Sequence, residues 1–319
     1  MTRSTKLATQ GYHNPVMLRE CIEALNINPE GTYIDATFGG GGHSRAILEK
    51  LKGGRLIGFD QDEDAKKQAE LIQHRSFTFC QANFMHMKRY LKLQGATQAD
   101  GILADLGVSS HQIDSPTRGF STRFEGPLDM RMNQQGTLTA AHVLNEYTEE
   151  QLHKIFGMYG EVKNARTLAN RICQQRATQR FESSQQLIAV LKTLAPRGKE
   201  YKYYAQVYQA LRIEVNHEME ALEQFLMQCG EVLKPGGRLV VMSYHSLEDR
   251  LVKNYINTGK VYGELEKDFY GNPLKPFEAV TRKPVEASEE EVKENNRARS
   301  AKLRVAEKIV TGKKRSNNR

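Results

Sequence analysis

The first third of the chain alternates short apolar runs with stretches whose apolar residues recur at helical spacing. The apolar runs predict four strands, at residues 32–38, 55–59, 76–80 and 99–106. The stretches between them predict three helices, at residues 43–51, 62–73 and 85–93. Uninterrupted apolar strands that alternate with helices are typical of a parallel sheet covered on both faces. We therefore predict the α/β class, with a doubly wound, mostly parallel sheet.

The pattern changes between residues 114 and 211, where the apolar spacing is helical and no strong strand signal occurs. Clear helices are predicted there at residues 165–176 and 184–194. Alternation then resumes with a helix at residues 218–233, a Lys-Pro-Gly-Gly turn at 234–237 and a strand at 238–244. This interruption predicts a discontinuous α/β domain, residues 1–113 and 212–311, with a helical domain of residues 114–211 inserted into it.

The end of the chain carries two further strand patterns and two charged segments. Residues 279–285 and 301–306 are predicted to be strands. The acidic stretch between them, residues 286–294, is predicted to be a solvated loop or a helix. Residues 312–319 are predicted to be a disordered basic tail.

Composition narrows the class of protein. A net charge of +8 favours a polyanionic partner such as RNA without requiring one. The four cysteines are scattered and form no Cys-x-x-Cys pair, which argues against a zinc site and a disulfide framework, so no metal is predicted. The first residues lack the apolar core of a signal peptide, and no apolar run approaches membrane-spanning length. We predict a soluble cytoplasmic protein that does not enter a membrane.

A glycine-rich turn follows the first predicted strand. The segment from Asp35 to Ser44 contains consecutive glycines, Gly39 to Gly42, directly before a predicted helix. Glycines let the backbone turn sharply beside a ligand, and a helix N-terminus offers it free N–H groups. Asp60 ends the second predicted strand, where a carboxylate accepts hydrogen bonds from ribose hydroxyls. These features predict a nucleoside-containing cofactor. The alternative is a structural turn with Asp60 on the surface.

Further details favour one cofactor, although the turn alone does not exclude a dinucleotide. The turn lacks the Gly-x-Gly-x-x-Gly spacing, and Asp35 suits the charged end of S-adenosylmethionine. The Lys-Pro-Gly-Gly turn before the later strand is common in methyltransferases. We therefore predict S-adenosylmethionine as the cofactor. His43 either contacts it or occupies the first helical turn, and Phe84 either stacks on adenine or belongs to the core.

Another set of polar residues follows the fourth and fifth major strands. Asp105 ends the fourth strand and is expected to point into the cofactor crevice, because ligands of open α/β sheets bind beyond the carboxyl ends of the strands. His245 follows the strand at residues 238–244 on the same edge and is a candidate general base. Its alternative role is to cap or pack against a helix that starts at Ser246.

Eight long motifs span nearly the whole chain. They are HNPVML at residues 13–18, the turn at 35–44, DGILADLGVSSHQ at 100–112, RGFS at 118–121, LDMRM at 128–132, YQALRIEVN at 208–216, YHSLEDR at 244–250 and NRARSAKLR at 296–304. Together they resemble the ribosomal RNA small subunit methyltransferase H family. Tyr208 and Tyr244 depart from the family pattern, in which phenylalanine is more usual, and the link at residues 195–204 also differs from the common form.

The resemblance implies both an activity and a set of site residues. The activity is methyl transfer from S-adenosylmethionine to the exocyclic N4 of a cytidine in the decoding region of small-subunit ribosomal RNA. The implied fold is a class I methyltransferase sheet with an inserted helical domain. The implied partner is the ribosomal RNA or the assembled small subunit, and a homodimer is left open. The implied cofactor contacts are Gly41, Gly42, His43, Asp60, Phe84, Asp105 and Gln112.

The chemistry of N4 sets the catalytic predictions. Its lone pair is delocalised into the ring, so the enzyme must position the amine and accept its protons. We predict Asp105, Ser109 and His245 as the catalytic residues, the first two as acceptors and His245 as a group that takes one proton away. No Pro–Cys dipeptide occurs, so methylation at C5 through a cysteine lacks an obvious nucleophile.

Basic residues are candidates for holding RNA phosphates, although exposed arginines are often only solvated. The candidates are Arg118, Arg123, Arg131, Arg297, Arg299, Lys302 and Arg304.

Three rival interpretations of the function of the chain remain. They are a nicotinamide-dependent oxidoreductase, a non-catalytic ribosome assembly factor and a small-molecule methyltransferase.

Overall fold

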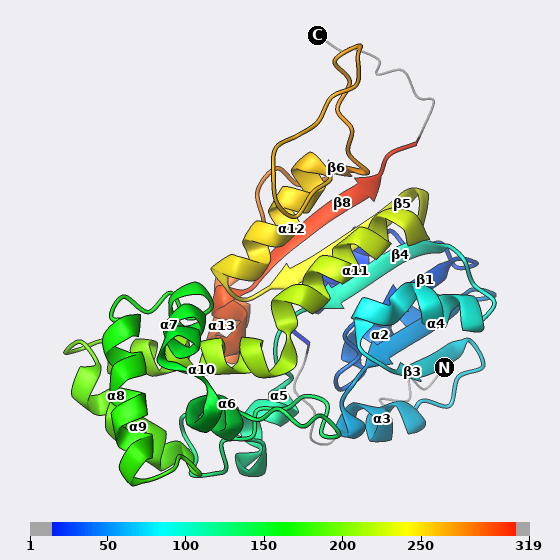
Figure 1. The fold of residues 1–319 in the computed structure, drawn as a ribbon. Helices are drawn as coiled ribbons and strands as arrows, with labels where there is room; N and C mark the ends of the chain where they lie inside the picture. The colour runs from blue at the N-terminus through cyan, green and yellow to red at the C-terminus, as the bar shows by residue number, and fades with distance from the viewer. Residues whose placement is uncertain (1–14, 311–319) are drawn as a thin grey trace.

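The structure, a computed structural model, describes residues 15–310 around one mixed sheet (Figure 1). The strand order is β3-β2-β1-β4-β5-β8-β6, and β7 also pairs with β8. The first five strands are parallel: β1 (Thr32–Asp35), β2 (Arg55–Asp60), β3 (Phe77–Gln81), β4 (Ala99–Asp105) and β5 (Leu233–Ser243). The antiparallel strands are β8 (Lys302–Lys308), β6 (Phe277–Ala279) and β7 (Val285–Glu286). The predicted α/β class with a mostly parallel sheet is confirmed.

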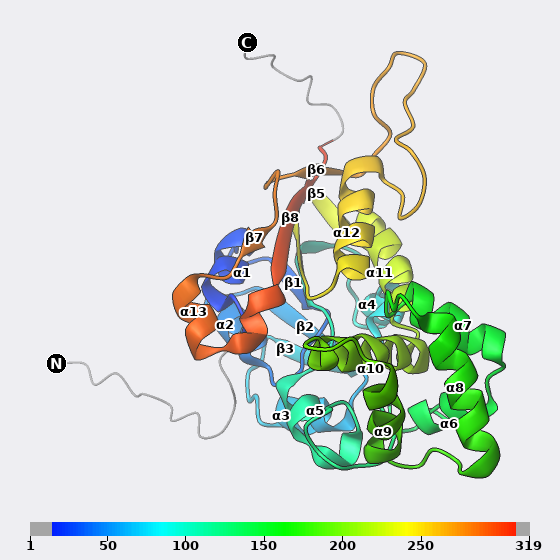
Figure 2. The same cartoon turned by 90° about the vertical axis from the view of Figure 1, so that its left-hand side faces the viewer.

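Helices cover both faces of this sheet (Figure 2). One face carries α1 (Leu18–Leu25), α2 (Gly42–Leu48), α13 (Glu289–Glu294) and the 3-10 turn η3 (Asn296–Ser300). The other carries α4 (Met87–Leu93), preceded by the 3-10 turn η1 (Phe84–His86), with α11 (Glu218–Val232) and α12 (Ser246–Thr258). Helix α3 (Glu63–Glu70) packs beside β3.

The side chains of β5 show why both faces are covered. Successive residues of a strand point to opposite faces. Leu239 and Val241 accordingly join the buried cluster under α11 and α12, whereas Val240 and Met242 join the cluster under α1 and α2. Because both faces of the strand are apolar, it needs a helical layer on each side. The predicted doubly wound arrangement is therefore confirmed.

The chain between β4 and α11 is helical and has a buried core of its own. Its elements are α5 (Ser110–Asp114), the 3-10 turn η2 (Pro116–Arg118), α6 (Ala140–Glu146), α7 (Glu149–Met158), α8 (Ala165–Thr178), α9 (Ser184–Leu194) and α10 (Glu200–Asn216). Phe156, Leu168 and Phe181 belong to its core. These helices lie beyond the carboxyl ends of β4 and β5 (Figure 1). Helix α10 runs through residue 211, and the predicted domain boundaries stay a prediction.

Two local predictions differ from the structure in detail, and a third is made more specific. The predicted strand at residues 279–285 is wrong, because only its ends are strands. Ala279 lies opposite Ala306 of β8, and Val285 lies opposite Leu303. Ala279 and Val285 are six residues apart, but their partners on β8 are only three apart. A single continuous strand could not make both pairings, so the chain between Ala279 and Val285 leaves the sheet. Residues 234–237 are predicted to precede the strand, but they lie inside β5 and interrupt its pairing with β4. Ala99 pairs with residue 233 and Gly101 with residue 238, so residues 234–237 have no partner on β4. The acidic stretch is in part the helix α13, which is one of the two alternatives predicted for it.

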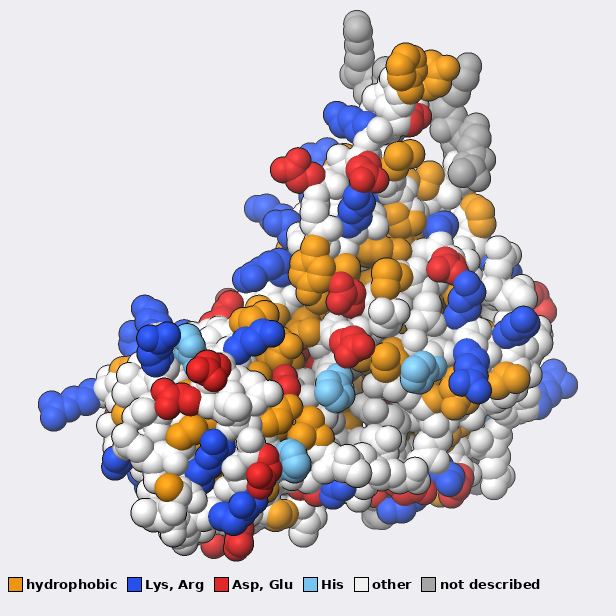
Figure 3. Space-filling model, in the orientation of Figure 1, with side chains coloured by type: hydrophobic (Ala, Val, Ile, Leu, Met, Phe, Trp, Pro, Cys, Tyr) orange, Lys and Arg blue, Asp and Glu red, His pale blue; other side chains and the backbone are white. Residues whose placement is uncertain are grey.

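A long loop, residues 259–276, projects from the sheet between α12 and β6 (Figure 1). Its tip carries exposed hydrophobic side chains (Figure 3), with Phe269 97% and Tyr270 85% exposed. Among the described residues, no helix has both the length and the apolar character needed to cross a membrane. The predicted basic tail, residues 312–319, and the first two residues of the motif at 13–18 lie outside the described residues.

Candidate active site

The glycine turn after β1 is closely packed at two of its glycines and less crowded at a third. Gly41 has a φ of 76°, and a Cβ there would lie 2.6 Å from the Phe38 ring. A Cβ at Gly42 would lie 2.2 Å from Cγ of Pro15. Gly39, with a φ of 52°, is less crowded, because an added Cβ would meet nothing closer than 3.9 Å. The turn therefore requires glycine at Gly41 and Gly42 for lack of space, and its positive φ angles favour glycine at Gly39 and Gly41.

Three carboxylates stand at the carboxyl ends of the neighbouring strands β2, β1 and β4. Asp35 accepts a hydrogen bond from the Ser44 hydroxyl (2.7 Å), and Asp60 from a backbone N–H of the glycine turn (2.8 Å). Asp105 accepts one from the Tyr244 hydroxyl (2.8 Å). Burial raises the pKa of Asp35 and of Asp60 to about 6, and the pKa of Asp105 to about 7. Because ionised carboxylates lack solvation here, this edge of the sheet favours a bound cation.

A small cleft opens at the same edge of the sheet. Gly107 lines it from the turn after β4, and Glu218 and Glu248 line it from the starts of α11 and α12. Phe84 lines it from the turn after β3 and packs edge-on against Phe225, with the ring centroids 5.1 Å apart. Phe84 thus belongs to the core and also borders the cleft. Its stacking on adenine stays a prediction.

Three other predicted site residues make hydrogen bonds or close polar contacts within the protein. His43 is buried, its Nε2 lies 3.3 Å from the Val16 carbonyl oxygen, and burial lowers its pKa to about 4. Gln112 and Ser109 form a capping box at the start of α5. The Gln112 Nε2 also donates to Asp62 Oδ2 (2.6 Å). Direct cofactor contacts of His43 and Gln112 stay predictions, and the observed bonds give both residues a structural role.

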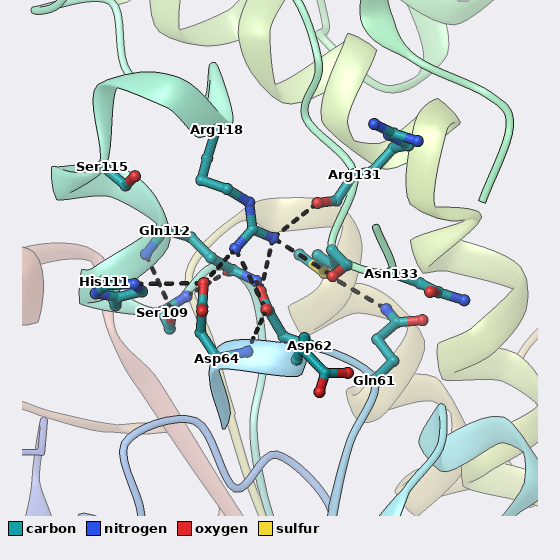
Figure 4. A network of polar contacts seen from close by, with 12 residues as sticks. Gln61, Asp62, Asp64, Ser109, His111, Gln112, Ser115, Arg118, Arg131 and Asn133 are labelled. Atoms are coloured by element: carbon teal, nitrogen blue, oxygen red, sulfur yellow. Dashed lines mark hydrogen bonds and ion pairs between the residues drawn. The ribbon is translucent and has the colours of Figure 1, made fainter. Parts of the chain in front are cut away.

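Arg118 is the centre of a buried polar network (Figure 4). Its Nη2 donates to Asp62 Oδ2 (2.7 Å) and to the Arg131 carbonyl (2.9 Å), and its Nη1 donates to Asp64 Oδ2 (2.9 Å). The Asp62 N–H donates in turn to Asp60 (2.9 Å). The prediction that Arg118 holds an RNA phosphate is wrong, because its guanidinium is buried among these carboxylates. It fastens the helical segment to the turn beside Asp60.

Several other candidate phosphate-binding arginines also have carboxylate partners. The pairs are Arg131–Asp129, Arg123–Asp114, Arg297–Asp114 and Arg304–Asp249. Two of these pairs could not be foreseen from one sequence, since the partners are 183 positions apart in Arg297–Asp114 and 55 in Arg304–Asp249. They reduce the positive charge offered to a polyanion. The phosphate contacts of these residues stay predictions.

His245 caps α12, as its alternative role required. Its Nδ1 accepts from the Glu248 N–H (3.5 Å), and its Nε2 lies 3.1 Å from Glu248 Oε1 without making a hydrogen bond. Both ring nitrogens are thus turned toward groups of the protein, Nδ1 toward the start of α12 and Nε2 toward the Glu248 carboxylate. The geometry therefore gives no support to His245 as a general base, and that role stays an untested prediction.

Potential metal-ligating atoms of Glu218, His245 and Glu248 lie within 4.8 Å of one another. Both carboxylate oxygens of Glu218 already accept from Arg212, at 2.8 and 2.9 Å. Burial raises the pKa of Glu248, but attraction to His245 and Arg212 and its hydrogen bonds outweigh this and leave the pKa lowered. Ion pairing thus accounts for the cluster, and the absence of a metal stays a prediction.

Sequence reasoning missed two contacts that shape the site. The Tyr244 hydroxyl reaches Asp105, and the Thr37 Oγ1 accepts the Asp105 N–H (2.6 Å). Tyr244 was visible as a departure from the family motif, but its partner depends on how the ends of β4 and β5 meet. Nothing in the sequence pattern singled out Thr37.

The fold and the site together define a class of enzyme. A parallel sheet with the reversed strand β8 beside β5, a glycine turn after β1 and an acid at the end of β2 is the arrangement of a class I S-adenosylmethionine-dependent methyltransferase. The model of the MraW methylase family matches residues 10–309. The chain belongs to this family. The resemblance, the enzyme class and the cofactor predicted from the sequence are thereby confirmed.

Two relatives that share one name are similar to this chain over nearly their whole length. The ribosomal RNA small subunit methyltransferase H of Cytophaga hutchinsonii is 57% identical over 297 residues, which cover 93% of this chain and 99% of the relative. That of Bacteroides fragilis is 53% identical over 298 residues, covering 93% and 97%. A solved rRNA methylase from Streptococcus thermophilus is 13% identical with a TM-score of 0.39, covering 92% of this chain and 94% of that one.

The residues present fit S-adenosylmethionine on three observations. A Cβ added to Gly39 or Gly107 would meet no atom closer than 3.9 or 3.7 Å, so these two glycines are less tightly packed than Gly41 and Gly42. The carboxylates of Asp35 and Asp105 have raised pKa values, so a positively charged ligand would stabilise their ionised forms. Asp60 keeps room for ribose hydroxyls, because each of its oxygens accepts a single backbone bond.

Proposed function

We propose that this chain transfers a methyl group to the exocyclic N4 of a cytidine in the decoding region of small-subunit ribosomal RNA. The observation that carries the proposal is sequence identity above 50% to proteins named ribosomal RNA small subunit methyltransferase H, over nearly their full length. The cleft at the strand ends supports it, since the methyl acceptor must meet the cofactor there.

The cysteines support an amine, and not a ring carbon, as the acceptor. Methylation at C5 of a pyrimidine uses a cysteine thiolate as nucleophile. Cys21, Cys80 and Cys229 are buried, and burial raises the pKa of each thiol. None of the four cysteines lines the cleft. The chain therefore offers no thiolate to attack the ring, and an amine acceptor needs none.

The cofactor supplies an electrophilic methyl group when bound, and the chain's residues hold and orient the reactants. We propose that Asp60 accepts from the ribose hydroxyls, that Phe84 stacks on the adenine, and that the backbone at Gly41 and Gly42 lies along the cofactor. The acceptor base must leave its stack, because its edge is inaccessible within an RNA helix. We further propose that the helical segment, residues 114–211, helps to hold the RNA, since it lies beyond the strand ends that form the cleft.

Asp105 is the best placed acceptor for a proton of N4. It directly precedes Leu106 and Gly107, which line the cleft. Its pKa of about 7 suits proton transfer near neutral pH, where both protonation states are accessible. Its Oδ1 is held by Tyr244, and no hydrogen bond to Oδ2 is found among residues 15–310. Ser109 caps α5 and remains a proposed second acceptor.

The test is nucleoside mass spectrometry of small-subunit RNA from cells that lack this activity, after reaction with the pure protein and S-adenosylmethionine. The proposal expects N4-methylcytidine at one position. Parallel reactions on naked RNA and on assembled subunits identify the form of the substrate. RNA binding without a methylated product would instead support the assembly-factor interpretation, and a methylated small molecule alone would reject an RNA substrate. A cytoplasmic location follows from the proposed substrate, and a homodimer is left to a sedimentation measurement.

A further inference from the structure

Tyr244 is placed by the pairing of two neighbouring strands. Asp105 ends β4 and lies opposite Met242 of β5, so Tyr244 follows two positions beyond that pair. Its ring lies beside the turn after β4, because a Cβ added to Gly107 would be 3.7 Å from its Cδ2. Its backbone N–H donates to Glu248 Oε2 (2.9 Å). Both ends of the residue are therefore fixed, and its hydroxyl donates to Asp105 Oδ1 at 2.8 Å.

Four titratable groups interact electrostatically with the Asp105 carboxylate. They are Asp35 of β1, Glu248 of α12, Cys21 of α1 and Tyr244 after β5. Burial is the largest effect and raises the pKa of Asp105, and the charges of Asp35 and Glu248 raise it further. The hydrogen bond from Tyr244 acts in the opposite direction, because it favours the ionised carboxylate. Of these groups, Tyr244 is therefore the one that helps Asp105 to act as a base.

We propose that Tyr244 is a positioning residue for methyl transfer, whose hydroxyl holds Oδ1 of Asp105 and turns Oδ2 toward the acceptor amine. The inference rests on the proposed function, in which Asp105 accepts a proton from N4. In that step the C–S bond of the methyl donor breaks as the N4–C bond forms. An N4–H bond breaks and an O–H bond forms at Oδ2, and the proton later passes to water. Tyr244 keeps its own proton throughout, so it affects the orientation and basicity of Asp105 and does not transfer a proton.

The test compares Tyr244→Phe with the wild type and with a matched control, Tyr255→Phe. Tyr255 is a buried tyrosine of α12 whose hydroxyl donates to a backbone carbonyl, so the control also removes one buried hydroxyl. Single-turnover methylation of small-subunit RNA is measured from pH 5.5 to 9. In Tyr244→Phe the acid limb of the pH–rate profile should move to higher pH by about one unit. This is the size expected for the loss of one hydrogen bond to a charged group. The rate at pH 6.5 should fall about fivefold to tenfold, and the rate at pH 9 should stay within about twofold of wild type.

A second measurement does not depend on activity. Carbon-13 NMR of carboxyl-labelled protein, with Asp105→Asn to assign the signal, reports the pKa of Asp105 directly. The inference expects a higher pKa in Tyr244→Phe and no change in Tyr255→Phe. An unchanged Asp105 pKa in a folded Tyr244→Phe protein overturns it, and so does an unmoved acid limb. If the wild type transfers no methyl group to RNA while the pKa shift is seen, the proposed function fails but the positioning of Asp105 by Tyr244 stands.

Discussion

Loss of the Arg118 guanidinium should destabilise the protein more than loss of any exposed arginine. Asp62 is 3% exposed and Arg118 7%, so Arg118→Ala leaves a buried carboxylate without its cation. Removing one partner of a buried ion pair costs about 3–5 kcal/mol. Arg123, which pairs with Asp114 at the surface, is the control, and Arg123→Ala should cost about 0–1 kcal/mol. Urea unfolding followed by circular dichroism gives both free energies of unfolding.

The same network should also affect the cofactor site. Asp62 is held by Arg118 and donates through its backbone to Asp60, the proposed ribose ligand. Arg118→Lys keeps the charge but loses the planar fork, so it should weaken S-adenosylmethionine binding about tenfold by calorimetry while retaining more stability than Arg118→Ala. A free energy of unfolding of Arg118→Ala within about 1 kcal/mol of the wild-type value would contradict the stabilising role of the network, and an unchanged cofactor affinity would contradict its role in binding.

Three further predictions concern the cofactor edge of the sheet. Asp60→Ala should weaken calorimetric binding of S-adenosylmethionine at least tenfold without changing the melting temperature by more than a few degrees, and unchanged affinity would remove Asp60 from the ribose site. Gly42→Ala should lower the free energy of unfolding by about 1–3 kcal/mol, because its Cβ would overlap Pro15, and an unaffected urea midpoint would contradict this packing. The folded pKa values of Asp35, Asp60 and Asp105 lie above the ordinary 3.8. The contribution of these groups to the stability of the ligand-free protein is therefore present below about pH 4 and is lost as the pH rises through 6 to 7. Because the ionised carboxylates attract the positively charged cofactor, added S-adenosylmethionine should raise the melting temperature more at pH 8 than at pH 5, and equal shifts would refute the placement of the cofactor beside these carboxylates.

The sheet was predictable because its strands obey strong local rules. Apolar runs such as residues 55–59 and 99–106 bury both faces, and glycines mark the turn after β1, so strand, turn and helix follow in a fixed order. The strand at residues 279–285 failed for a non-local reason. Its ends pair with positions of β8 that are only three residues apart, and that spacing cannot be seen in the segment's own sequence.

In the candidate site, too, the residues that follow local rules could be predicted and those fixed by long-range contacts could not. Asp60 and Asp105 could be placed from sequence, because the carboxyl ends of parallel strands meet at one edge. The partners of Arg118 and Tyr244 could not, since they depend on contacts between segments 54 and 139 positions apart. An arginine that binds a phosphate and one that binds a buried aspartate have the same local signature. Only the fold distinguishes them.

The position of β8 has a consequence for synthesis of the chain on the ribosome. β5 ends at Ser243, but the strand that pairs with it, β8, begins at Lys302, and β8 lies between β5 and β6 in the finished sheet. At about 5–20 residues per second, the apolar edge of β5 waits roughly 3–12 s for its neighbour to be made. The core of the helical segment is complete by residue 215, well before that moment. We therefore expect the helical segment to fold while the nascent sheet still has an open edge, and chaperones that shield unpaired strands to act on this protein during that interval.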